Sequence, residues 1–425
     1  MPTGTPAPAA ARRDFHTLWL GQTISLFGSQ CTLLALPITA AVTLGVGPAQ
    51  MGLLGAVETL PFILLSLPVG VWVDRRRRRG LLVWADLGRA LLLLILPALA
   101  LLGRLQFAHL LLVALAVGVL TQVFDLSYQS YLPTLVGRDR LLDSNGKLEA
   151  SRSLAQSAGP LLAGVAIQAL TAPVTLALDA LSFLLAAVCF ATIRTPEPDP
   201  GTRATRPLLT EIGEGLRFVY GQPLVRAIVG CSGTLNCCTF IQLAVFVLYA
   251  TRELGLSPAQ LGVAYACGGP GALLGALVSA RVVRWWGLGR TILVGATCQI
   301  AYCFAAPLAG VAPGVALPIL MAGYALFGLG LALYGINQLS LRQLVTPEAL
   351  QGRMNASLRF LVTGAIPIGS LAGGFLGERV GLQPTLLIGG VGCLTGLLWL
   401  LRSPLPALRD TPAQAAAHIP QPAQN

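Results

Sequence analysis

The sequence carries very little charge for its length. Its 425 residues include 28 Lys and Arg and 17 Asp and Glu, so that 11% of the chain is charged while 55% is hydrophobic. A soluble protein of this size has roughly a quarter of its residues charged. This chain has too little charge to coat a surface that faces water, which argues against a soluble enzyme or a globular protein of two domains.

The spacings that mark metal, redox and hydrolytic sites are also missing. The nine cysteines lie within apolar runs, without a CxxC pair or a neighbouring histidine. We interpret them as small packing residues. The sequence contains no GxSxG, no HExxH and no paired His/Asp cluster. We therefore predict no metal, no cofactor and no catalytic residue, and a membrane-embedded enzyme is the weaker alternative.

Positive charge is in excess, with a formal net charge of +11. No basic stripe interleaved with aromatic residues is present, so nucleic acid is not an expected partner. Twelve apolar stretches are instead long enough to cross a lipid bilayer as helices. They lie at about residues 15–44, 50–73, 80–102, 107–130, 149–170, 173–194, 223–251, 258–284, 289–311, 314–340, 354–381 and 383–402. The sequence predicts an all-α integral membrane protein.

The arginines indicate how the chain is oriented. With the N-terminus inside, only Arg104, Arg252 and Arg379 fall on outer connections, whereas 22 of the positive residues fall on inner loops and tails. Positive residues accumulate on the cytoplasmic side of membrane proteins. We therefore predict a multi-pass protein of the cell (inner) membrane with both termini in the cytoplasm.

One connection, residues 195–222, is longer than the others. It begins with a Pro-rich stretch and continues with the spacing of a short amphipathic helix on the inner membrane surface. The predicted organisation is a cytoplasmic N-terminal tail (1–14), a six-helix bundle (15–194), this linker (195–222), a second six-helix bundle (223–403) and a disordered C-terminal tail (404–425).

The two bundles share internal repeats. Residues 129–136 match residues 338–345 at an offset of 209, and Arg75 matches Arg284 at the same offset. Two parallel, pseudo-symmetric halves are typical of secondary transporters, whose site lies between the halves.

The end of the second apolar stretch reads Gly70-Val-Trp-Val-Asp74-Arg75, followed by four more arginines. This resembles the loop signature between helices 2 and 3 of the major facilitator superfamily, although Arg77 stands where the signature has a glycine. The resemblance covers the full twelve-helix length and implies that fold. Gly70 would allow close helix approach, and Asp74 would pair with arginines or face a helix N-terminus. We interpret Gly70, Asp74 and Arg75 as a latch of the inner gate, with a plain basic anchor as the alternative.

The fifth stretch contains Gly159-Pro160 and, four residues further on, Gly164. This resembles the signature of the superfamily's antiporters, and generic packing is the alternative. The two glycines remove side-chain bulk and Pro160 removes a backbone donor, so the helix can bend and pack tightly. Segments 19–22 and 148–152 resemble an exporter branch that includes macrolide-efflux proteins and the enterobactin exporter. That resemblance implies outward transport of a bulky organic molecule.

Ionisable side chains inside the predicted helices need a partner or a water-filled cavity. Those in the first half are Glu58, Asp86, Arg89, Asp125, Glu149, Arg152 and Asp179. Asp86 and Arg89 are three residues apart and can pair on one helix face. Glu149 and Arg152 can pair likewise, or Arg152 can reach Asp125 instead. In the second half only Arg359 lies at comparable depth.

Glu58 and Asp179 have no positive residue within one turn of their own helix. A carboxyl without a cation in apolar surroundings holds a proton more readily, which suits a group that loads and releases protons. We hypothesise that at least one of Glu58, Asp125 and Asp179 couples proton entry to substrate exit. The superfamily's proton-linked exporters often carry an arginine in helix 4, and this sequence lacks it.

Polar residues at helical spacing are candidates for lining a substrate cavity, with interhelical hydrogen bonding as the alternative role. They are Gln22, Gln30, Asn236, Thr239, Tyr334, Asn337 and Gln338. The sequence as a whole predicts a monomeric secondary active transporter whose partners are the lipid bilayer, protons and a small-molecule substrate. The substrate would be a drug, macrolide or siderophore, exported by proton antiport with alternating access. An uncoupled facilitator, an importer or a non-transporting membrane sensor are the alternatives.

Overall fold

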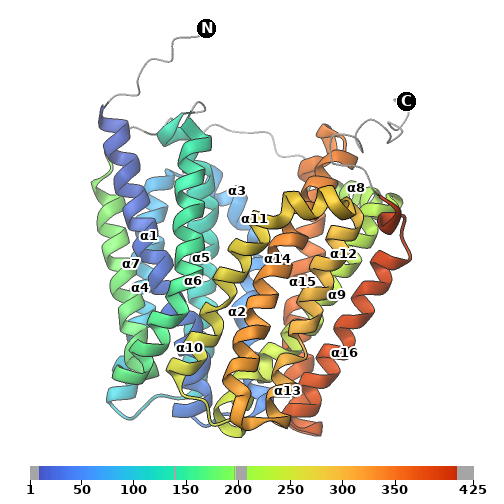
Figure 1. Cartoon of the computed structure of the whole chain (residues 1–425). Coiled ribbons are helices and arrows are strands. Elements are labelled where there is room, and N and C mark those ends of the chain that lie inside the picture. The colour runs from blue at the N-terminus through green and yellow to red at the C-terminus, as the bar shows by residue number, and fades with distance from the viewer. Residues whose placement is uncertain (1–8, 138–139, 196, 198–207, 409–425) are drawn as a thin grey trace. The chain divides into compact units, whose positions relative to one another are not determined.

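The computed structural model describes residues 9–137, 140–195, 197 and 208–408, and all regular structure within this part is helical (Figure 1). Eleven helical segments of the described residues are long and apolar enough to cross a membrane. The expected class of an all-α membrane protein is confirmed.

The chain divides into two compact units. Unit 1 comprises residues 1–203 and 256–266, and unit 2 comprises residues 204–255 and 267–425. Residues 256–266 therefore group with unit 1, whereas the sequence assigned them to the second bundle.

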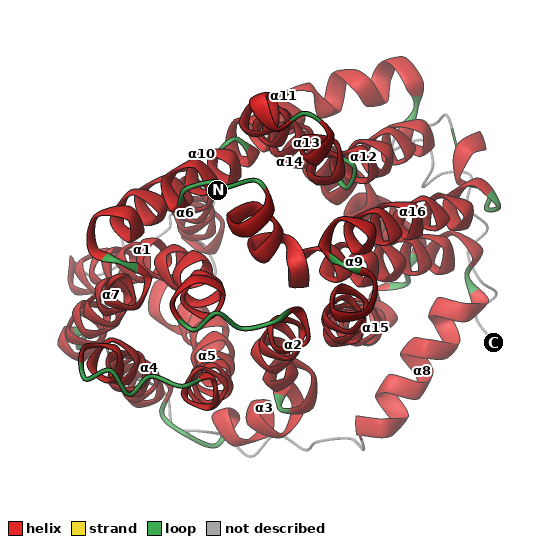
Figure 2. Cartoon of the chain, turned by 90° about the horizontal axis from the view of Figure 1, so that it is seen from below, coloured by secondary structure: helices red, strands yellow, loops and turns green. Residues whose placement is uncertain are grey.

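Unit 1 is a bundle of helices that pack side by side. Its helices are α1 (Ala9–Ile38), α2 (Pro48–Leu64), α3 (Ser66–Asp74), α4 (Arg78–Leu101), α5 (Phe107–Val136), α6 (Leu141–Leu170), α7 (Ala172–Thr192) and α10 (Pro258–Ala266). Helix α1 packs on α6 and α7, α4 packs on α5 and α7, and α10 packs on α6 (Figure 2). Leu18, Phe124, Tyr131 and Phe190 are fully buried members of its apolar core.

Unit 2 is built in the same way. Its helices are α8 (Leu208–Gly221), α9 (Pro223–Leu248), α11 (Gly268–Trp286), α12 (Leu288–Tyr302), α13 (Ala305–Val311), α14 (Ala316–Val345), α15 (Glu348–Val380) and α16 (Leu382–Leu401). Helix α9 packs on α15 and α16, and α14 packs on α11 and α12. Helix α8 lies in the segment where the sequence predicts a linker helix, and it packs on α15. Linker residues 196 and 198–207 lie outside the described residues.

Prolines interrupt three of the predicted helices. The stretch 50–73 is divided into α2 and α3 at Leu65, because Pro68 has no N–H to donate to the Leu64 carbonyl. Helix α10 ends at Ala266, four residues before Pro270. The break between α12 and α13 likewise lies a few residues before a proline, Pro307. Each break leaves backbone carbonyls that need other donors.

The internal repeat is visible in the backbone. Helices α1 and α9 each end in a π-helical turn, at Thr39–Thr43 and Tyr249–Glu253. A glycine with positive φ follows each turn, Gly45 at +64° and Gly255 at +63°. These matching features support the two-fold repetition deduced from the sequence.

The start of the C-terminal tail is ordered, which differs from the expectation of a disordered segment from residue 404. Residues Leu405–Ala407 form a 3-10 helix, and Leu405 is fully buried. The Gly289 N–H donates to the Leu408 carbonyl at 3.1 Å. The apolar Leu405 side chain docks this segment on α12. Residues 409–425 and 1–8 lie outside the described residues.

Candidate functional site

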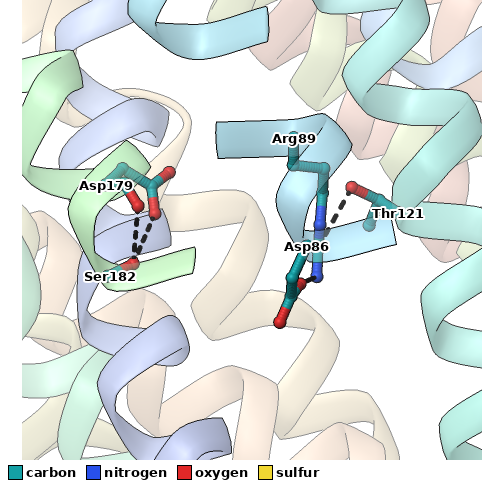
Figure 3. A network of polar contacts seen from close by, with 5 residues as sticks. All are labelled: Asp86, Arg89, Thr121, Asp179 and Ser182. Carbon is teal, nitrogen blue, oxygen red and sulfur yellow. Dashed lines mark hydrogen bonds and ion pairs between the residues drawn. The ribbon is translucent and has the colours of Figure 1, made fainter. Parts of the chain in front are cut away.

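A buried ion pair lies within unit 1. Arg89 Nη2 contacts Asp86 Oδ1 on the same face of α4, and the two side chains are 5% and 0% exposed. Arg89 Nη1 also lies 3.5 Å from Thr121 Oγ1 on α5 (Figure 3). The i, i+3 spacing in the sequence suggests this pair, and the structure contains it.

Aromatic rings hold the Arg89 guanidinium in place. Its central carbon lies 4.1 Å from the ring centroid of Phe183 on α7 and 4.4 Å from that of Phe124 on α5. Such cation–π contacts become stronger when water is excluded. Arg89 therefore joins three helices, α4, α5 and α7.

Asp179 on α7 lies one turn from Phe183 and is 1% exposed. Its Oδ2 accepts a hydrogen bond from Thr32 Oγ1 of α1 at 2.5 Å. Its Oδ1 lies 3.0 Å from Ser182 Oγ (Figure 3). No ion pair to Asp179 is found among the described residues, although Arg89 and Asp86 are near enough to act on it electrostatically.

Asp86, Arg89 and Asp179 form what we call the acidic cluster. It contains two carboxyl groups and one guanidinium, all at most 5% exposed. The cluster is electrically neutral only when one carboxyl carries a proton. Because net charge in a buried, apolar setting is costly, this composition suits a site that takes up a single proton.

The other candidate carboxyls have different surroundings. Glu58 on α2 is half-buried and makes no hydrogen bond or ion pair with the described residues. Asp125 on α5 is half-buried. Glu149 and Arg152 are both exposed on α6, and the described residues contain no ion pair between them. Among the described residues of unit 1, the charged groups that are at most 5% exposed are those of the acidic cluster.

The gate signature lies at the end of α3. Asp74 is the last residue of that helix, its side chain lies outside the described atoms, and Arg75 is exposed. A Cβ added at Gly70 would meet no described atom within 4 Å. The expected close helix approach at Gly70 is therefore not seen.

The basic run instead holds the beginning of the linker. Glu197 Oε2 and Oε1 accept hydrogen bonds from the N–H groups of Arg78 and Arg79 at 2.7 and 2.8 Å, which caps the N-terminus of α4. The Arg79 side chain donates to the carbonyls of Phe190 and Ala191 at the end of α7. Sequence spacing does not indicate this role of Glu197, because its partners are about 120 positions away.

Asp14 fixes the same segment from the other side. Its Oδ2 accepts hydrogen bonds from the Thr195 N–H at 2.8 Å, the Thr195 hydroxyl at 2.6 Å and the Arg194 N–H at 3.0 Å. Arg194 and Thr195 are therefore attached to α1 of unit 1, and Glu197 is attached to α4.

The helix 5 signature packs within unit 1. A Cβ at Gly164 would lie 2.5 Å from the Pro258 carbonyl oxygen and 3.0 Å from the Gly262 Cα of α10. A Cβ at Gly262 would overlap the Pro160 carbonyl oxygen. A Cβ at Gly159 would overlap the side chain of Gln30 on α1. These positions need glycine because two helices approach each other closely there.

Most of the candidate cavity residues are occupied by hydrogen bonds between helices. Tyr334 lies 2.8 Å from Ser232 Oγ, and Asn337 donates to Ser279 Oγ at 2.9 Å. Asn236 donates to the Val362 carbonyl at 3.4 Å, and Thr239 lies 3.9 Å from Cys393 Sγ. The remaining three are Gln22, which is buried, and Gln30 and Gln338, which are half-buried.

Two further buried polar residues, Gln242 and Arg342, are not among the candidates that the sequence indicates. Gln242 Nε2 donates to the carbonyls of Cys303 and Leu386, at 2.7 and 2.5 Å. The Cys303 carbonyl needs this donor because Pro307, four residues further on, has no N–H. A buried glutamine together with a proline in another helix is the sequence feature that could indicate such a contact. The sequence predicts an inner loop at Arg342, but α14 continues to Val345 and Arg342 is only 5% exposed.

The sequence matches the family model of the Major Facilitator Superfamily over residues 18–369. The chain belongs to this superfamily of transporters. Macrolide efflux protein A of Streptococcus pyogenes is 22% identical over 380 residues, covering 88% of this chain and 92% of that protein. The multidrug efflux pump Tap of Mycobacterium tuberculosis is 28% identical over 400 residues, covering 88% and 89%.

Solved structures show the same fold. A bacterial homologue of the iron transporter ferroportin in an inward-facing state has a TM-score of 0.74 at 18% identity, covering 92% of this chain and 98% of that one. The nucleoside transporter NupG has a TM-score of 0.70 at 11% identity, covering 92% and 98%. The protein is therefore a multi-pass membrane transporter of the major facilitator fold.

Proposed function

We propose that this protein exports a small-to-medium organic molecule across the cell membrane in exchange for protons. The observation that carries the coupling is the composition of the acidic cluster, which encloses two carboxyl groups with one guanidinium. Similarity to a macrolide efflux protein and to multidrug efflux pumps supports the outward direction and the organic substrate.

Asp179 is the residue to which we assign proton uptake. Asp86 has the Arg89 guanidinium as a direct partner, so its charge is compensated in the folded protein. Asp179 has only neutral hydroxyl partners, Thr32 and Ser182. The hydroxyls can accept or donate, so they can accompany either protonation state. Helices α1, α4, α5 and α7 all contact the cluster, so its charge state acts on their packing.

The test is transport by the purified protein in liposomes with an imposed pH gradient. Candidate substrates come first from a susceptibility screen with macrolides, siderophores and cationic dyes in a bacterium that lacks its own pumps. We expect Asp179→Asn to abolish gradient-driven substrate movement while substrate exchange without a gradient persists. Asp143→Asn, an exposed carboxyl on α6, serves as the control.

Three results would contradict the proposal. Full gradient-driven transport by Asp179→Asn would remove this residue from coupling, and substrate movement that ignores the gradient in the unmodified protein would indicate an uncoupled facilitator. If no substrate moves under any condition while the protein is folded, a sensor built on the same fold becomes the better interpretation.

A further inference from the structure

Three polar residues lie on one face at the end of α14. Gln338, Arg342 and Thr346 follow one another at intervals of four residues, so their side chains are stacked along the helix. Arg342 is 5% exposed, Thr346 is 4% exposed and Gln338 is half-buried. Thr346 is the residue that directly follows the last residue of α14, Val345.

The donors of this face have no partners among the described residues. Arg342 Nε and Nη1 and Thr346 Oγ1 are all buried without a hydrogen-bond acceptor or donor. The described residues provide no carboxylate as an ion-pair partner for Arg342 either. Tyr334 and Asn337, two other buried polar residues of α14, do have partners. A buried guanidinium without an acceptor is unfavourable, so an acceptor from outside the chain would stabilise it.

The fold does not itself require a cation at this position. The internal repeat aligns Arg342 with Pro133, at an offset of 209, in the corresponding helix α5 of unit 1. Pro133 is exposed and carries no charge. The corresponding helix of unit 1 ends without an arginine at this position. We therefore infer that Arg342 has a role other than maintaining the fold that the two units share.

Open space borders the same face. Gly335 precedes Arg342 by seven residues, which is two helical turns, so both lie on one side of α14. A Cβ added at Gly335 would meet no described atom within 4 Å. The side of α14 that carries Arg342 is therefore not packed by described atoms at Gly335.

We propose that Arg342, together with Thr346 and Gln338, binds an oxyanion, either a carboxylate or a phosphate group. The guanidinium supplies the positive charge and strong N–H donors, and the hydroxyl and amide supply neutral donors. Two sources offer this chemistry: an acidic group on the transported molecule and the phosphate of a lipid headgroup. The binding site itself does not depend on proton coupling.

The experiment measures thermal unfolding of the purified full chain in an uncharged detergent, with separate probes for the two sources. Inorganic phosphate and benzoate represent soluble oxyanions, and phosphatidylglycerol added to the micelles represents the lipid. Sodium chloride at equal ionic strength corrects for screening. The variants are Arg342→Gln, Arg342→Lys and Thr346→Val, and the exposed Arg359→Gln of α15 is the matched control.

We expect at least one probe to raise the unfolding temperature of the unmodified protein and of Arg359→Gln. The same probe should have no effect on Arg342→Gln and a reduced effect on Arg342→Lys and Thr346→Val. A response to phosphate or benzoate alone identifies a soluble anion, and a response to phosphatidylglycerol alone identifies the headgroup.

The proposal is overturned if no probe distinguishes the unmodified protein from Arg342→Gln and Arg342→Lys, or if Arg359→Gln loses the response equally. Should Arg342→Gln not fold, Arg342→Lys and Thr346→Val decide the outcome, because both keep a similar side-chain size. None of these measurements uses a pH gradient, so their result is independent of whether transport is coupled to protons.

Discussion

Gly28 of α1 and Asp179 of α7 lie so close together that a methyl group at residue 28 would come within 2.6 Å of Asp179 Oδ1. The same methyl group would overlap Ser182 Oγ. The absence of a side chain at residue 28 is what allows α1 to approach the acidic cluster and lets Thr32, one turn further on, reach the carboxylate.

Gly28→Ala should therefore disturb the acidic cluster. Overpacking in an enclosed site costs about 1–3 kcal/mol, and here the displaced groups are Asp179 and Ser182. We expect a large loss of gradient-driven transport, measured in liposomes, with a smaller loss of stability. Gly146→Ala on α6 is the control, because a Cβ there meets no described atom within 4 Å. Equal transport by the two variants would contradict the assignment.

Thr32→Val removes the hydroxyl that bonds to Asp179 without changing the side-chain shape much. A hydrogen bond to a charged group contributes about 1.5–3 kcal/mol, so we expect a loss of roughly tenfold or more in coupled flux. Thr32→Ser keeps the hydroxyl and should retain most of the activity. The prediction is wrong if Thr32→Val and Thr32→Ser transport equally well.

Glu197→Ala should destabilise unit 1 by removing the cap of α4. Loss of a helix cap costs about 0.5–2 kcal/mol, and Arg78 and Arg79 would lose the acceptor for their N–H groups. The free energy of unfolding, measured by denaturant titration, should fall by that amount. The control is Asp143→Ala, which breaks an exposed ion pair with Lys147 and should cost less than about 1 kcal/mol. If the control loses as much, the cap has no special role.

Gly164→Ala should loosen the contact between α6 and α10. The new Cβ would lie 2.5 Å from the Pro258 carbonyl oxygen, so the two backbones must move apart. We expect a destabilisation of about 1–3 kcal/mol. The Gly146→Ala control should instead gain about 0.5–1 kcal/mol from improved helix propensity. Thermal unfolding of the two variants side by side checks both signs.

Thr171→Gly should stabilise the protein. Thr171 joins α6 to α7 with a φ of +83°, and it is the one non-glycine residue with positive φ in the described part of the chain. A non-glycine residue in such a conformation costs about 1–3 kcal/mol. Gly381 occupies the corresponding position between α15 and α16 with a φ of +94°. Gly381→Thr should destabilise the protein. The measurement is thermal unfolding, in which Thr171→Gly should raise the unfolding temperature and Gly381→Thr should lower it.

The sequence by itself determined the membrane class, the helices and the repeat. Low charge and long apolar stretches suffice for this, because a bilayer forces the backbone to satisfy its hydrogen bonds within helices. The i, i+3 spacing of Asp86 and Arg89 likewise predicts their pairing, since neighbours on one helix turn are fixed by helix geometry alone.

Only the tertiary structure decided which distant groups meet. Thr32 and Asp179 are 147 positions apart, and Glu197 reaches the N-terminus of α4 from 118 positions away. Helical periodicity gives the face on which a residue lies but not the helix that covers it. For the same reason helical spacing does not distinguish Glu58, Asp125 and Asp179 from one another. Packing encloses Asp179 near Arg89 and leaves Arg342 buried without an acceptor among the described residues.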